Sequence, residues 1–256
     1  MLREGFELGP LTLGGRSLRI VVHGGSCAQR TAVFLHDGLG TIDAWKEIPQ
    51  QFATDYSVRV VIYDRWGYGG SESRNRFEPG FMEAEVPTLM EVIDAVGSTS
   101  VDLVGHSDGA TIALLAAAWH PRRVRSVVSI AGHTFVEPET TKSIQALRDG
   151  LNRGVSPAWL GRLHGDRGRS LLEAWAGVWL GKSHAEWDVR GELSRVKCPV
   201  LALQGDSDEF GTADQLVAIS DLVRDVEIWQ SCGGHSVHHD LSEEFVRRVG
   251  EFWSRS

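Results

Sequence analysis

The segment around residue 107 constrains the fold more than any other part of the chain. An apolar β-type run at 101–104 leads into a turn with the pattern G-x-S-x-G at 105–109. An Ala- and Leu-rich run typical of a helix follows at 110–119. A serine on such a tight turn is held in a strained backbone conformation, and the glycines two residues away remove side chains that would clash. The turn therefore predicts that the hydroxyl of Ser107 is exposed above a helix N-terminus.

Near-continuous apolar runs alternate with helical patterns along most of the chain. This is typical of a mostly parallel central sheet flanked by helices on both faces, and so of the α/β fold class. We expect strands at 18–22, 31–35, 58–63, 101–104, 124–130, 196–203 and 226–229. We expect helices at 43–52, 82–96, 110–119 and 242–253.

The alternation stops between the strands at 124–130 and 196–203. Because a structureless loop of that length is improbable in a compact domain, we interpret 133–195 as a helical insertion. The predicted organisation is a core made of 1–132 and 196–256, with 133–195 forming a cap, or lid, over the carboxyl edge of the sheet.

Composition excludes several classes of partner. The 256 residues carry a formal net charge of −8, which argues against nucleic acid and anionic membranes. No apolar run reaches the length of a membrane span, and the N-terminus lacks a secretion-signal core. Three cysteines without a C-x-x-C spacing argue against a disulfide framework. We therefore expect a cytoplasmic monomer or homodimer whose partner is a small molecule.

Five motifs occur in an order that resembles the α/β-hydrolase fold family. They are HDGLG at 36–40, DRWGYGGS at 64–71, GHSDG at 105–109, GDSD at 205–208 and GGH at 233–235. The resemblance covers nearly the whole chain and implies a serine hydrolase that needs no cofactor and no metal. It also implies the chain order serine, acid, histidine. The segment 64–71 matches a loop of the family that we interpret as a structural turn.

The resemblance implies a catalytic triad. Ser107 would be the nucleophile and His235 the base that takes its proton, with a carboxylate holding the imidazole in one tautomer. In the family the acid usually stands three residues after the glycine that ends the preceding strand, which selects Asp208. Asp206 is the main alternative, interpreted otherwise as a turn-forming residue, and Glu209 is a more distant one.

A metal site at the C-terminal histidines is the less favoured interpretation. His238, His239 and Asp240 follow His235 closely, but their spacing matches no H-E-x-x-H pattern. The family also needs no metal, so we expect none.

The oxyanion hole requires two N–H groups aimed at the position where negative charge develops. One should be the backbone N–H of Asp108. The resemblance assigns the other to Gly38, with Leu39 as the alternative one residue further along. Many family members have glycine where this chain has Asp37.

Four residues are candidates for substrate contact: Asp108, Leu39, Trp159 and Trp179. The Asp108 carboxylate either stabilises the N-terminus of its own helix or accepts a substrate cation, as the similar Ser-Asp-Gly elbow of amino-acid ester hydrolases in the family suggests. The insertion also contains Trp175 and Trp187. Its tryptophans either pack the cap onto the core or line an apolar pocket.

The expected activity is hydrolysis of a small carboxylic ester through an acyl-enzyme on Ser107. Carbon–carbon bond, amide, lactone and thioester hydrolysis use the same triad and stay open as alternatives. A non-catalytic receptor for a small ligand is the alternative from another class. A cofactor-free oxygenase is less consistent with the intact order of serine, acid and histidine.

Overall fold

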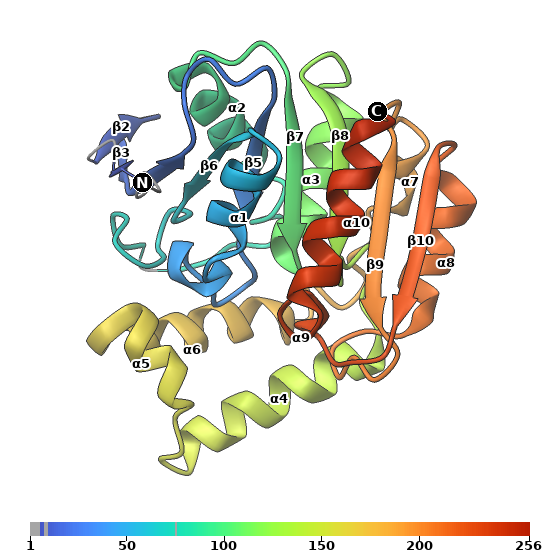
Figure 1. The fold of residues 1–256 in the computed structure, drawn as a ribbon. Helices are drawn as coiled ribbons and strands as arrows, with labels where there is room; N and C mark the ends of the chain where they lie inside the picture. The colour runs from blue at the N-terminus through green and yellow to red at the C-terminus, as the bar shows by residue number, and fades with distance from the viewer. Residues whose placement is uncertain (1–5, 8–9, 75) are drawn as a thin grey trace.

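A single mixed sheet forms the centre of the molecule. The computed structural model describes residues 6–7, 10–74 and 76–256. Within these residues, eight strands pair in the order β1-β4-β6-β5-β7-β8-β9-β10 (Figure 1). Their bounds are β1 Phe6–Glu7, β4 Ile20–His23, β5 Thr31–Leu35, β6 Arg59–Tyr63, β7 Val101–His106, β8 Val124–Ile130, β9 Val200–Gly205 and β10 Val226–Ser231. Strands β2 (Leu11–Leu13) and β3 (Arg16–Leu18) form a separate antiparallel pair.

The sheet is parallel from β6 to β10, while β4 runs antiparallel to β6 and to β1. The expectation of one strand at 18–22 is corrected, because β3 ends at Leu18 and β4 begins at Ile20. No helix lies between β4 and β5, and a parallel connection needs a crossover of a dozen residues or more. The short link therefore makes β4 and β5 run in opposite directions. Because β5 is parallel to β6, β4 is antiparallel to β6.

Helices cover both faces of the sheet, as the continuous apolar strands predict. Helices α1 (Ile48–Asp55) and α10 (Ser242–Ser254) pack on one face, where Phe52, Phe245 and Trp253 join the core. Helices α2 (Glu85–Ala95), α3 (Asp108–Trp119) and α8 (Ala213–Leu222) cover the other face (Figure 1). Helix α3 is buried from Asp108 to Ala118, which explains why its sequence is apolar on every side.

The chain between β8 and β9 is helical. It forms α4 (Pro138–Asn152), α5 (Ala158–His164), the 3₁₀ turn η2 (Gly165–Arg167), α6 (Gly168–Trp179) and the short α7 (Arg190–Leu193). Helices α4, α5 and α6 lie beyond the carboxyl ends of the parallel strands, whereas α7 packs against α3 and α8 (Figure 1). The remaining short elements are η1 (Ile42–Trp45) and α9 (Val237–Asp240). None of the helices in the described part of the chain is long and apolar enough to span a membrane.

Candidate active site

Ser107 lies at the junction of β7 and α3, in a conformation that a non-glycine residue rarely adopts. Its φ is 54° and its ψ is −121°. A Cβ on Gly105 would overlap the backbone of Gly109, and a Cβ on Gly109 would overlap the carbonyl oxygen of Leu35. The two glycines therefore let β7, α3 and β5 approach closely enough to hold the serine in this strained turn.

Asp208 and His235 are brought together from two loops at the carboxyl ends of β9 and β10. Nδ1 of His235 lies 2.9 Å from Oδ1 of Asp208. The same carboxylate accepts hydrogen bonds from the backbone N–H of Phe210 at 2.9 Å and from the side-chain amide of Gln204 at 3.2 Å. Because Asp208 accepts from Nδ1–H, the other ring nitrogen, Nε2, is left as the basic one.

The charge of this pair is stabilised on both sides. Burial opposes a charge on His235, but the hydrogen bond and negative charge of Asp208, with further contributions from Asp37 and Glu209, raise the pKa of the imidazole. Burial also opposes a charged Asp208, yet its hydrogen bond and attraction to His235 lower the pKa of the carboxyl. The imidazolium form of His235 is therefore more stable, relative to the neutral ring, than the imidazolium form of an isolated histidine.

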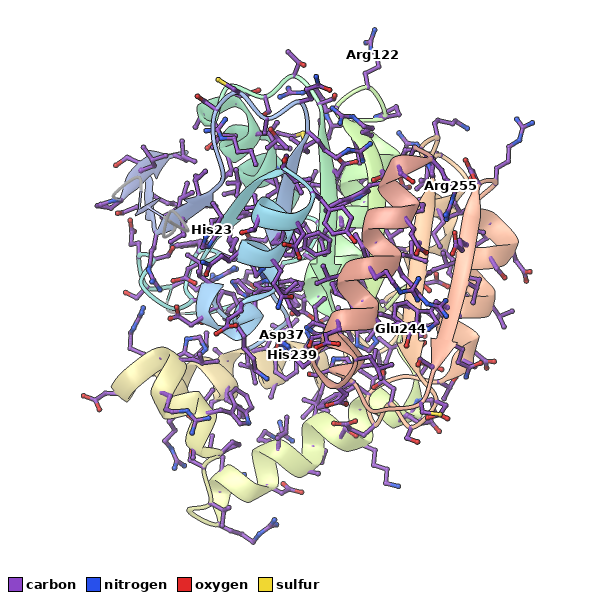
Figure 2. The ribbon with its side chains drawn as sticks, in the orientation of Figure 1. His23, Asp37, Arg122, His239, Glu244 and Arg255 are labelled. Carbon is purple, nitrogen blue, oxygen red and sulfur yellow. The ribbon has the colours of Figure 1, made fainter. Side chains whose placement is uncertain are left out.

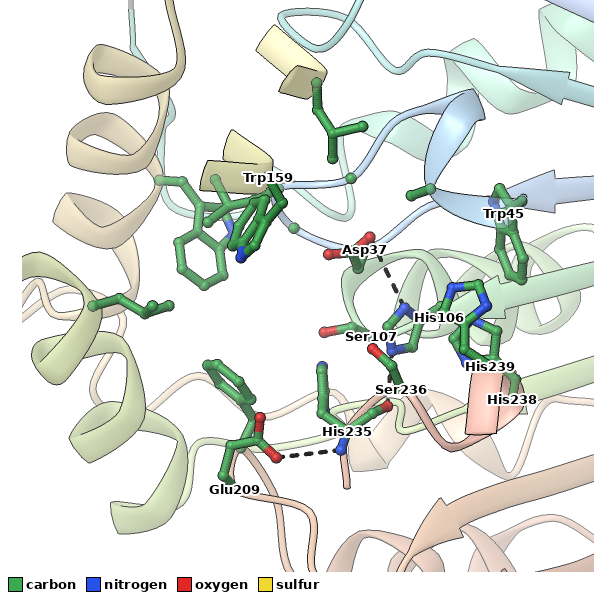
Figure 3. Close-up of a pocket in the computed structure, with 18 of the residues that line it drawn as sticks. Asp37, Trp45, His106, Ser107, Trp159, Glu209, His235, Ser236, His238 and His239 are labelled. Carbon is green, nitrogen blue, oxygen red and sulfur yellow. Dashed lines mark hydrogen bonds and ion pairs between the residues drawn. The ribbon is translucent and has the colours of Figure 1, made fainter. Parts of the chain in front are cut away.

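Ser107 and His235 line the same cavity, whose volume is about 700 Å³. His106 connects them: it precedes Ser107, its Nε2 donates to the carbonyl of His235 at 3.0 Å, and the two imidazole rings lie 4.9 Å apart. Asp37 and His239 line the cavity, and Figure 2 shows both near the helices α4–α6, away from the end of the molecule where Arg122 lies. Figure 3 shows Ser107 facing the cavity above His235.

The two other acids considered for the histidine take different positions. Asp206 accepts hydrogen bonds from the Ser207 hydroxyl and the Gly233 backbone, which fits a loop-capping carboxylate on the surface. Glu209 lines the cavity and accepts from the backbone N–H of His235 at 3.3 Å, not from its ring. Among the three, Asp208 is the one that contacts the imidazole.

The loop after β5 provides the wall of the cavity opposite His235. Asp37, Gly38 and Leu39 all line it. Nε1 of Trp175 lies 2.6 Å from where a Cβ on Gly38 would be, so only glycine fits beneath this indole. Asp108 begins α3, and the first N–H groups of a helix have no acceptor within it. The backbone N–H groups of Gly38 and Asp108 thus lie on the two chain segments that border Ser107.

The carboxylate of Asp108 is buried behind the cavity wall and is not among the residues that line it. Its Oδ2 accepts from Nε1 of Trp175 at 2.9 Å and lies 3.9 Å from the guanidinium of Arg65. Burial raises the pKa of Asp108 to about 6, although Arg65 and Trp175 act in the opposite direction. This position corrects the expectation that the side chain contacts substrate, because its oxygens face Trp175 and the protein interior.

Leu39, Trp159 and Trp179 line the cavity and stay candidates for substrate contact. Trp175 lines the cavity as well. Trp187 does not line it, and its indole N–H donates to Glu83 at 2.8 Å. The apolar side chains that the insertion contributes are Ile144, Leu147, Trp159, Leu163, Trp175 and Trp179. The tryptophans thus serve both alternatives, since Trp179 is buried against Trp187 while also reaching the cavity.

Two further histidines, His133 and His106, lie beside the candidate base and were not predicted as site residues. His133 stacks on His235 with ring centroids 5.9 Å apart, and burial lowers its pKa to about 3. Burial likewise lowers the pKa of His106 to about 4. Both are neutral at pH 7. His106 occupies the variable position of the G-x-S-x-G pattern, which was the available signal; His133 follows β8 without a motif.

The described residues contain no group of histidine, cysteine and acidic side chains arranged to hold a metal ion. His238 packs against the rings of Trp45, His106 and Phe245. Its contacts are those of a core residue.

Comparison with known proteins identifies the family of this chain. Residues 31–190 match the model of the alpha/beta hydrolase fold family. The chain is 33% identical over 270 residues to "Putative carbamate hydrolase RutD" of Caulobacter sp. (strain K31), covering 91% of this chain and 94% of that protein. It is 28% identical over 210 residues to "Serine hydrolase BPHL" of Mus musculus, covering 75% of this chain and 68% of the relative.

Solved structures share the same architecture. The enol-lactonase from Burkholderia xenovorans LB400 superposes with a TM-score of 0.75 at 17% identity, over 96% of this chain and 99% of that one. MGS-M2, an alpha/beta hydrolase enzyme from a Medee basin deep-sea metagenome library, superposes with a TM-score of 0.80 at 17% identity, over 97% and 98%. The chain therefore belongs to the alpha/beta hydrolase fold family and is a hydrolase by its relatives.

Proposed function

We propose that this chain is a serine hydrolase that cleaves small carboxylic esters through an acyl-enzyme on Ser107. The observation that carries the proposal is the 2.9 Å contact between Asp208 and Nδ1 of His235, at the cavity that Ser107 also lines. The relative from Mus musculus is named a serine hydrolase, and RutD is named for carbamates, whose carbonyl is open to the same attack.

In the proposed first step, Nε2 of His235 takes the proton of the Ser107 hydroxyl as its oxygen attacks the ester carbonyl. Asp208 stabilises the imidazolium that forms. The carbonyl oxygen becomes an oxyanion held by the N–H groups of Gly38 and Asp108. When the tetrahedral intermediate collapses, His235 returns the proton to the departing alcohol, and the acyl group stays on Ser107.

In the second step, His235 removes a proton from a water molecule, whose oxygen attacks the acyl carbonyl. The tetrahedral intermediate then collapses: the bond between the acyl carbon and the Ser107 oxygen breaks, His235 returns the proton to that oxygen, and the acid is released. The apolar side chains from the insertion would hold the acyl or alcohol part of the substrate by burial. We also propose that 133–195 acts as the cap of this cavity, because α4, α5 and α6 contribute most of its apolar lining.

Covalent labelling tests the proposal. A fluorophosphonate should label the wild-type chain at Ser107, and Ser107→Ala should abolish both the label and the hydrolysis of p-nitrophenyl acetate. Asp208→Asn should reduce kcat by about 10⁴-fold, as loss of the orienting carboxylate does in serine proteases.

A folded wild-type chain that neither labels nor turns over ester, yet binds a small ligand tightly, would instead indicate a receptor. Labelling together with faster cleavage of a vinylogous diketone than of the ester would indicate a carbon–carbon bond hydrolase.

A further inference from the structure

Arg65 is buried completely, in the loop that follows β6. Its guanidinium lies over the ring of Tyr68 at 4.6 Å, and its Nη2 donates to the carbonyl oxygen of Asp37 at 2.8 Å. Among the described residues its Nε and Nη1 find no hydrogen-bond acceptor. A buried guanidinium with so few partners is costly to the fold, so its one strong contact indicates what it does.

That contact is to the peptide group that contains the Gly38 N–H. The carbonyl oxygen of Asp37 also faces Nδ1 of His36 at 2.8 Å. Nε2 of His36 accepts from the backbone N–H of Arg65 at 3.0 Å, so Nδ1 carries the proton and donates. The backbone N–H of Gly40 also donates to this oxygen at 3.2 Å, so three donors, among them the buried side chains of His36 and Arg65, hold the 37–38 carbonyl. Since the structure contains no cis peptide in its described residues, the N–H of Gly38 points the opposite way, toward the cavity that Gly38 lines.

The positive charge of Arg65 also lies near Asp108, the residue that carries the second N–H donor. Its Nη2 lies 3.9 Å from Oδ2 of Asp108, whose backbone N–H begins α3. Two carboxylates belong to the residues that carry or adjoin these donors: Asp37 lines the cavity, and Asp108 is buried behind its wall beside Trp175. Without a nearby cation they would oppose negative charge on the substrate oxygen. A fixed guanidinium behind both donors offsets that repulsion and polarises the 37–38 peptide.

We propose that Arg65 is a positioning residue for the oxyanion hole, holding the 37–38 peptide so that the Gly38 N–H meets the developing oxyanion. The proposal rests on the serine-hydrolase function proposed above. It gives the segment 64–71 a part in the reaction beyond that of a structural turn.

Two variants of Arg65 and one matched control test the proposal with p-nitrophenyl acetate. Arg65→Gln should lower kcat by about 10–100-fold with KM changed less than about threefold, because the lost contact acts in the transition state. Arg65→Lys keeps a cation and should recover part of that loss. The control, Arg74→Gln, removes a buried arginine that pairs with Glu85 at 3.5 Å in the same region, and it should leave kcat within about threefold of wild type.

Inhibitor binding separates positioning from a general loss of structure. An aryl trifluoromethyl ketone forms a hemiketal with Ser107 and places an oxyanion in the hole. Its inhibition constant should weaken in Arg65→Gln by the same factor as kcat/KM, while inhibition by the product p-nitrophenol stays within about twofold of wild type. A merely structural role would move both inhibitors together.

Equal kcat and equal ketone affinity in Arg65→Gln and Arg74→Gln would overturn the proposal and leave the hydrolase function intact. If the wild-type chain neither reacted with the fluorophosphonate nor hydrolysed the ester, both the hydrolase function and the role of Arg65 would be overturned. Should neither Arg65 variant fold, a crystal structure of the wild-type chain with the ketone decides. The proposal requires the oxyanion within about 3.1 Å of the Gly38 nitrogen, with the contact from Arg65 to Asp37 retained. An oxyanion bound elsewhere would overturn it.

Discussion

Opposing electrostatic effects set the basicity of His235. Burial disfavours its imidazolium form, while Asp208 within hydrogen-bond distance and the charges of Asp37 and Glu209 favour it. The net result is a pKa above the ordinary value for histidine. The base is therefore more basic than a free imidazole. As the pH falls, it becomes protonated, and so inactive as a base, at a higher pH than a free imidazole would.

The carboxylate of Asp37 lines the cavity beside His106 (Figure 3). Its negative charge stabilises the imidazolium of His235, so Asp37→Asn should lower the pKa of His235. Because a protonated His235 is inactive as a base, the acidic limb of the kcat/KM profile should move to lower pH.

Asp43→Asn is the control for this pH profile. Asp43 also lines the cavity, but its carboxylate pairs with Arg19 at 3.3 Å. The limb should stay in place in this variant. A limb that moves to higher pH in Asp37→Asn, or equally in both variants, would show that Asp37 does not act through the charge of His235.

At the scale of elements, the close approach of α3 to the sheet depends on glycines. Gly109→Ala would place a methyl group into the carbonyl oxygen of Leu35, which belongs to β5 and cannot move without breaking strand pairing. We expect a loss of about 1–3 kcal/mol in the free energy of unfolding, measured with urea.

Gly177→Ala is the matched control, on helix α6, where the added methyl meets no atom within 4 Å apart from the surrounding backbone of its own helix. This substitution should stabilise the chain by about 0.4–1 kcal/mol, because alanine favours a helix and glycine does not. The same change in the free energy of unfolding at both sites, or stabilisation by Gly109→Ala, would contradict the packing described for α3.

The elements that the sequence predicted best are those whose burial is complete. Strands β5 and β8 begin and end where the apolar runs do, since both faces of each are covered. Helix α8 was not predicted, although the side chain of Thr212 caps it by accepting a hydrogen bond from the backbone N–H of Asp214. Only two of its apolar residues, Leu216 and Ile219, are buried, so the ten-residue segment lacks the long periodic pattern that identifies a helix.

Candidate site residues were predictable where a backbone constraint left a motif. The turn at Ser107 needs its glycines, and the loops at Asp208 and His235 follow strands at the same edge of the sheet. The partners of Arg65 and Asp108 were not predictable, because they depend on where Trp175 and the 37–38 peptide lie in three dimensions. An aspartate whose carboxylate is buried and one whose carboxylate faces a pocket are the same residue type, so the sequence does not distinguish them.

At the scale of the whole molecule, Trp175 links the helical insertion to the core. Its indole comes from α6, packs over Gly38 and donates to the buried carboxylate of Asp108 on α3 at 2.9 Å. Trp175→Phe keeps most of the ring but leaves that carboxylate oxygen without its donor. We expect a loss of about 1–3 kcal/mol in the free energy of unfolding at pH 8.

The loss should be smaller at pH 5. Burial raises the pKa of Asp108 to about 6 in the folded chain, above its value in the unfolded chain, so the folded state takes up a proton as the pH falls through 6. Protonation removes the charge that the missing donor leaves exposed to the interior. Trp187→Phe, which loses a hydrogen bond to the partly buried Glu83, is the control and should cost less than Trp175→Phe at pH 8. If Trp175→Phe cost as much at pH 5 as at pH 8, the carboxylate would not be what the indole stabilises. In that case the link between insertion and core would depend on packing alone.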